Sequence, residues 1–124
     1  MTKQEIFDKV ATHLLTQRKP CLVGKTSDGC CYRKGKLKCA AGCLLPKGIN
    51  PENQPWNDEP WDCVPQRIRD LAGVPKAADR LVEALQAVHD YPSNWALGRV
   101  SDELKRVAGR FRLQKTIVDK FPVL

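Results

Sequence analysis

Apolar residues recur with helical spacing over much of the chain. Thr2 followed by Glu5 has the pattern of a capping box, and the apolar positions that come next return every three or four residues, which predicts a helix over about 3–17. The same spacing predicts further helices over residues 66–72, 77–89 and 93–111, and a final helical turn within 113–121. The helix over 93–111 is long and amphipathic, with Ser93 as its N-cap.

The middle of the chain has a different pattern. Residues 30–33 and 36–39 read as two short strands around a tight turn at Lys34-Gly35, where glycine can supply a positive φ, and a polar turn is expected before them at 26–29. A buried helical turn should follow at 40–45. Residues 46–65 contain five prolines, too many for a regular element, and are expected to form a loop.

These elements predict one α+β domain, residues 1–124, mostly helical, with four to five helices around a small antiparallel β-hairpin. Hydrophobic residues make up 42% of the 124 residues and charged residues 28%, as in ordinary globular proteins. The chain starts with charged residues, and no stretch approaches the roughly 18 apolar residues of a membrane span. We therefore expect a cytoplasmic protein that does not contact a membrane.

The charge is unevenly distributed. The net charge is +7, and residues 18–38 hold seven basic residues against one acidic residue, which makes a polyanion a natural partner. Nucleic acid is possible, although no sequence-reading motif is present, and a merely solvated basic surface is the alternative. Farther on, Arg99 with Glu103 and Asp102 with Arg106 have the spacing of helical ion pairs. The basic residues that we assign to partner binding are Arg33, Lys34, Lys36, Lys38, Arg110 and Arg112.

The proline-rich loop has the opposite charge. Residues 50–63 contain four acidic residues and no basic one, interleaved with Trp56 and Trp61. Rigid aromatic side chains dominate many interfaces, so Trp56 and Trp61 are candidate protein-binding residues. The alternative is that they fold back onto the core, which we expect for at least one of them.

Six cysteines in a chain without an export signal point to thiols or metal ligands. Cys31 (or Cys30) with Cys39, Cys43 and Cys63 could supply four thiolates for zinc, but their spacing is not that of paired ligand turns, and filling the core around the hairpin is the simpler role. A reactive thiol needs a nearby base, and nothing in the sequence brings His13 or His89 to a cysteine. His89 is expected to interact with the end of its own helix. We thus expect no enzyme and no cofactor.

Three segments, Cys31-Tyr32-Arg33, Lys38-Cys39-Ala40-Ala41-Gly42-Cys43-Leu44-Leu45-Pro46 and Leu85-Gln86-Ala87-Val88-His89-Asp90, resemble a pattern in small uncharacterised phage and prophage proteins. The resemblance extends from the Gln4-Glu5-Ile6-Phe7 start to Val107-Ala108, and the chain departs from the pattern after Pro46. It implies a mobile-element origin, and so a bacterial host cell, but no activity and no site residue.

Small phage accessory proteins often bind and block a host machine, as anti-CRISPR inhibitors do. By this analogy of size and origin, the leading hypothesis is a binding protein that inhibits a host or defence protein or ribonucleoprotein complex. The alternatives are a nucleic-acid-binding module with a basic hairpin and a small cysteine-liganded zinc protein. The oligomeric state does not follow from the sequence.

Overall fold

The computed structural model describes residues 1–22 and 31–122, and this part of the chain contains six α-helices and one two-stranded sheet. Helix α1 (Lys3–Gln17) begins at the predicted capping box, in which Thr2 and Glu5 bond each other's main-chain N–H groups. The predicted bounds of this helix are confirmed. The turn expected at 26–29, together with Lys25 and Cys30, lies outside the described residues.

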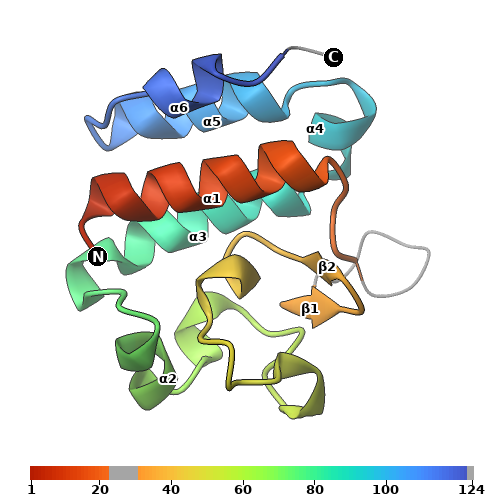
Figure 1. Ribbon diagram of the computed structural model, residues 1–124, viewed down its shortest axis with the longest axis vertical. Helices are drawn as coiled ribbons and strands as arrows, with labels where there is room; N and C mark the ends of the chain where they lie inside the picture. Colours follow the sequence, from red (N-terminus) through yellow and green to blue (C-terminus); the bar gives the residue numbers. More distant parts are fainter. Residues whose placement is uncertain (23–30, 123–124) are drawn as a thin grey trace.

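Helix α1 lies in the middle of the molecule (Figure 1). Helix α3 (Asp79–Asp90) runs beside it, and α5 (Val100–Arg110) and α6 (Thr116–Asp119) pack on one side of this pair. The hairpin, the proline-rich loop and α2 (Gln66–Leu71) lie on the other side. The expected class, α+β and mostly helical, is confirmed, with the hairpin at one side of the helices.

The long helix expected from Ser93 to Phe111 is divided in two. Helix α4 (Pro92–Ala96) starts at a proline, which suits a first turn because its N–H would be unsatisfied there anyway. Gly98 then adopts a φ of 65° and turns the chain sharply before α5. Ser93 is therefore inside α4 and is not an N-cap. The turn allows α5 to fold back along α3.

The hairpin is short. Strand β1 (Arg33–Lys34) pairs antiparallel with β2 (Leu37–Lys38), with Arg33 opposite Lys38. Gly35 has the expected positive φ, 61°, but the turn is formed by residues 35–36, one position later than predicted.

The segments around the hairpin form short 3₁₀ turns. The buried turn expected after the hairpin is η1 (Gly42–Leu44), and the loop contains η2 (Pro51–Asn53) and η3 (Trp61–Cys63). A further turn, η4 (Lys76–Ala78), leads directly into α3.

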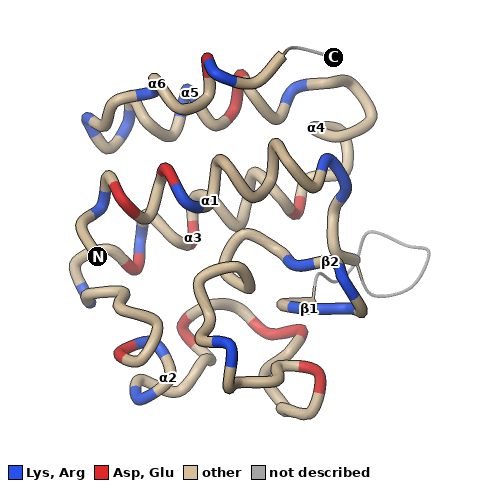
Figure 2. The backbone as a smooth tube through the Cα atoms, viewed as in Figure 1, with Lys and Arg blue, Asp and Glu red and all other residues tan. Residues whose placement is uncertain are grey.

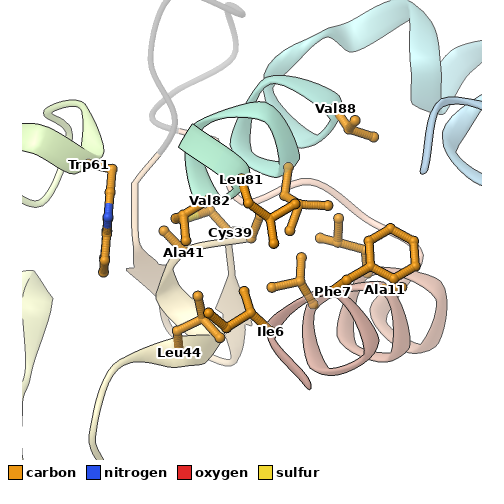
Figure 3. Close-up of a cluster of buried hydrophobic side chains, with 14 of the residues drawn as sticks. Ile6, Phe7, Ala11, Cys39, Ala41, Leu44, Trp61, Leu81, Val82 and Val88 are labelled. Atoms are coloured by element: carbon orange, nitrogen blue, oxygen red, sulfur yellow. The ribbon is translucent and has the colours of Figure 1, made fainter. Parts of the chain in front are cut away.

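One cluster of buried apolar side chains connects these elements. Ile6 and Phe7 of α1 face Leu81 and Val82 of α3, and Leu44 of η1 closes the cluster from the hairpin side (Figure 3). Within the described residues, no helix has both the length and the apolar character needed to cross a membrane.

Candidate binding groove

The basic hairpin presents fewer cations than its sequence suggests. Lys34 and Lys36 are exposed, whereas Arg33 and Lys38 are half-buried. The main chain of Lys38 is fixed to α1: its N–H donates to Gln17 Oε1 at 2.9 Å, and its carbonyl accepts a hydrogen bond from His13 Nε2 at 3.0 Å. Burial lowers the pKa of His13, and the hydrogen bond to Lys38 opposes this shift.

The acidic loop packs directly on this hairpin. The Gly35 N–H, at the hairpin tip, donates to Glu52 Oε1 at 2.7 Å. Tyr32, just before β1, donates its N–H to the Asn57 carbonyl at 2.9 Å and its hydroxyl to the Glu59 carbonyl at 2.8 Å. Acidic segments of the loop lie beside the basic hairpin in Figure 2. The acidic loop and the basic hairpin, two separate candidate binding segments in the sequence, therefore pack against each other.

Both tryptophans of the loop are buried, which corrects their assignment as exposed binding residues. Trp61 is 1% exposed and donates Nε1–H to Asp79 Oδ1 at 2.9 Å. Trp56 is 6% exposed and packs edge-on against Tyr32, with ring centroids 5.5 Å apart. In a small core, a large ring contributes more by leaving water than by staying on the surface. The alternative, that tryptophan covers the core, holds for both.

The four candidate zinc ligands do not come together. Cys63 is exposed on η3, whereas the sulfur atoms of Cys39 and Cys43 bond main-chain groups of their own turn: the Gly42 N–H at 3.2 Å and the Ala40 carbonyl at 3.1 Å. Burial raises the pKa of the Cys43 thiol to about 12. The pKa of the exposed Cys63 thiol is raised by slight desolvation and by the negative charges of Asp62 and Glu59. Among the residues that the structure describes, no three His, Cys, Asp or Glu side chains are grouped to hold a metal ion.

His89 is fully buried and is held at both ring nitrogens. Its Nε2 accepts the Cys21 N–H at 2.8 Å, so the ring proton is on Nδ1, which donates to Asp90 Oδ1 at 2.8 Å. Cysteine, histidine and aspartate are also the residue types of an activated thiol, but here the imidazole faces a main-chain amide. His89 therefore contacts Asp90, the last residue of α3, as expected for the end of its own helix, and it also joins α3 to the segment after α1.

The segments that carry the phage-protein resemblance meet in the structure. The Ala41 N–H donates to Gln86 Oε1 at 2.9 Å, and the Cys39 N–H donates to the Tyr32 carbonyl at 3.2 Å. Gly42 lies directly against the main chain of Tyr32. These residues join the hairpin and η1 to α3, which is a structural role.

A groove between α3 and α5 is a candidate site for a ligand. It has a volume of about 420 Å³, within the usual size of ligand sites. The small or short side chains of Ala84, Ala87 and Val88 on α3 and Val107 on α5 line it and leave the space open. Tyr91, 61% exposed, lies at one end of α3 and also lines the groove.

The groove is basic because of one face of α5. Arg99, Glu103, Arg106 and Arg110 follow one another at spacings of four, three and four residues, which places them along the same side of the helix. The three arginines are exposed. Glu103 Oε1 lies 3.7 Å from Arg106 Nη2, so Arg106 pairs with Glu103 and not with Asp102 as expected.

Only part of this groove can be predicted from the sequence. Arg110 was assigned to partner binding and does line the groove, with its guanidinium 5.4 Å from the Phe111 ring centroid. Arg112 is exposed just beyond the end of α5. Arg99 and Arg106 were assigned to ion pairs, and the alanines of α3 carry no chemical signal. The i, i+7, i+11 spacing of the arginines was the signal that could have revealed the site.

The chain matches no model of a protein family, no curated protein and no solved structure.

Proposed function

We propose that this chain is a phage-type accessory protein that acts by binding, and that its α3–α5 groove captures an acidic amphipathic helix of a host protein. The observation that carries the proposal is the combination of an apolar floor with three exposed arginines along one wall. An amphipathic helix places apolar side chains in such a groove and polar ones at its rim.

The charge at the rim selects the ligand. Three arginines against Glu103 leave an excess of positive charge, and a guanidinium can bond a carboxylate through two parallel N–H groups. The floor contains Ala84, Ala87, Val88 and Val107, which offer contact to aliphatic side chains and no hydrogen-bond partners. A polynucleotide would gain little from this floor, because its affinity depends mainly on phosphate contacts.

The groove supports binding better than the hairpin does. At the hairpin, Glu52 already bonds the tip, and only Lys34 and Lys36 are fully exposed. The resemblance of the hairpin and α3 segments to phage and prophage proteins supports a bacterial partner. We propose that the partner is a protein or ribonucleoprotein complex of the host or of its defence system, and that binding of this chain inhibits that complex.

The test compares two charge reversals of equal size. In Arg106→Glu/Arg110→Glu the groove loses its positive rim, and in Lys34→Glu/Lys36→Glu the hairpin loses its exposed cations. Each protein also carries a photo-crosslinking side chain at Ala87, which lines the groove and is exposed. After irradiation in nuclease-treated bacterial lysate, mass spectrometry identifies the crosslinked peptide, and binding of the purified partner is measured by fluorescence anisotropy.

We expect a crosslinked peptide rich in Asp and Glu with apolar residues at helical spacing. The partner protein that contains this peptide should bind the groove variant at least about tenfold more weakly than it binds the hairpin variant. Loss of binding only in the hairpin variant would overturn the proposal in favour of the hairpin. A ligand that is captured only from lysate without nuclease would also overturn the proposal, in favour of nucleic acid.

A further inference from the structure

Cys21 and Cys31 form a sulfur–sulfur contact in the interior of the protein. Their Sγ atoms are 3.1 Å apart, and the two residues are 0% and 3% exposed. A disulfide bond is about 2.05 Å long, so the atoms are in contact without being bonded. Neither the groove nor the proposed function uses this pair.

The main chain holds the two cysteines in register. The Cys31 N–H donates to the Cys21 carbonyl at 3.3 Å, so the two residues lie side by side as in a pair of adjacent strands. The Cys21 N–H is in turn fixed by His89 Nε2, and Cys21 Sγ lies 3.5 Å from the Leu37 carbonyl of β2. The short sulfur distance is thus supported by the backbone on both sides.

Two other cysteines are occupied differently. The sulfur atoms of Cys39 and Cys43 bond main-chain groups within their own turn, and Cys63 is on the surface. Within residues 1–22 and 31–122, Cys21 and Cys31 are the cysteines whose sulfur atoms are recorded at contact distance from each other.

We propose that Cys21 and Cys31 are a redox-modification site, at which a small disulfide such as oxidised glutathione converts the two thiols into a reversible intramolecular disulfide. Cys31, the less buried of the two, loses its proton and attacks one sulfur of the small disulfide. A mixed disulfide forms and one small thiolate leaves. The deprotonated Sγ of Cys21 then attacks Cys31 Sγ and releases the second. Two protein thiols are oxidised, one small disulfide is reduced, and the two small thiolates take up the two protons.

The new bond would close a ring over residues 21–31 and tie the segment after α1 to the hairpin. Cross-linking restricts the unfolded chain, and this favours the folded state even for a ring of this size. Because Cys21 is also bonded to His89, the oxidised protein would have the hairpin covalently linked to the segment that α3 holds.

The test uses the full chain with Cys63→Ser, which removes an exposed thiol. The protein is equilibrated in buffers of reduced and oxidised glutathione, quenched by alkylation and mapped by mass spectrometry. We expect a peptide linked through Cys21, together with a melting temperature about 5–10 °C higher in the oxidised form. Reduction should reverse both changes.

Cys30 and Cys31 are neighbours, so Cys30→Ala and Cys31→Ala distinguish them. The link and the thermal shift should persist in Cys30→Ala and disappear in Cys31→Ala. The proposal is overturned if the Cys63→Ser protein keeps both thiols alkylatable in oxidised glutathione, or if the linked pair is any other. The mapping of linked cysteines in the Cys63→Ser protein does not require that either alanine variant folds.

Discussion

At the scale of single residues, Gly42 shows how tightly the hairpin region is packed. Its N–H donates to Cys39 Sγ at 3.2 Å, and a methyl group in place of its hydrogen would overlap the main-chain carbonyl of Tyr32. The clash would be with main-chain atoms of Tyr32, so a change of side-chain rotamer cannot relieve it. Glycine is needed here for space, since the φ of Gly42 is not in the left-handed region.

Gly42→Ala is expected to lower the free energy of unfolding by about 3 kcal/mol, because η1 must move away from the main chain of Tyr32. Gly48→Ala provides the matched control, since a Cβ at Gly48 meets no atom within 4 Å. The control should change the stability by less than about 0.5 kcal/mol. Urea unfolding followed by circular dichroism measures both, and equal effects would show that the contact at Gly42 is unimportant.

At the scale of elements, two glycines near the groove have opposite roles. Gly98 has a φ of 65° and forms the turn between α4 and α5. Gly109 lies within α5 and is exposed, and a Cβ there would meet no atom within 4 Å. Position 98 requires glycine because of its backbone conformation. At position 109 glycine has no such role and lowers the stability of the helix.

Gly98→Ala and Gly109→Ala should therefore change the stability in opposite directions. The first is expected to destabilise the protein by about 1 kcal/mol, because alanine is strained at positive φ. The second should stabilise it by about 0.5–1 kcal/mol, because alanine loses less backbone entropy in a helix. Thermal unfolding of the two variants tests this, and a destabilised Gly109→Ala would indicate that α5 does not continue through that residue.

The same elements show what the sequence could predict. The capping box and apolar spacing of α1 are local signals, and its predicted bounds match the structure. The break at Gly98 was missed because the apolar positions Leu97 and Val100 keep helical spacing across it. The burial of Trp56 and Trp61 and the α3–α5 groove depend on contacts between distant segments, such as the one between Trp61 and Asp79, which local patterns do not encode.

At the scale of the whole molecule, Asp79 connects three parts of the fold. Its Oδ1 accepts from Trp61 Nε1 in the loop at 2.9 Å, and its Oδ2 accepts from Arg69 Nη1 of α2 at 3.0 Å, while Asp79 itself starts α3. The side chains of Arg69 and Asp79 are 14% and 18% exposed. The Arg69 Nε is buried without a hydrogen-bond partner among the described residues, so this guanidinium depends on Asp79.

Asp79→Ala is expected to lower the free energy of unfolding by about 3 kcal/mol, because it leaves the Trp61 indole and the Arg69 guanidinium without their acceptor. Asp79→Asn should lose less, since its amide oxygen can still accept from Trp61. Asp70→Ala serves as the control, because it removes an exposed carboxylate that accepts a hydrogen bond from Gln66, one turn away on α2. If chemical denaturation gave the same free energy of unfolding for both alanine variants, the contacts of Asp79 would not stabilise the fold.

The central place of α1 also determines when this protein can finish folding. Its buried face, which includes Ile6, Phe7 and Leu14, is covered by α3, α5 and α6, all of which are translated much later. A nascent chain therefore leaves this apolar face exposed to solvent until α3, α5 and α6 have left the ribosome. Because the contacts that cover α1 are distant in sequence, the core of the protein is completed late in synthesis.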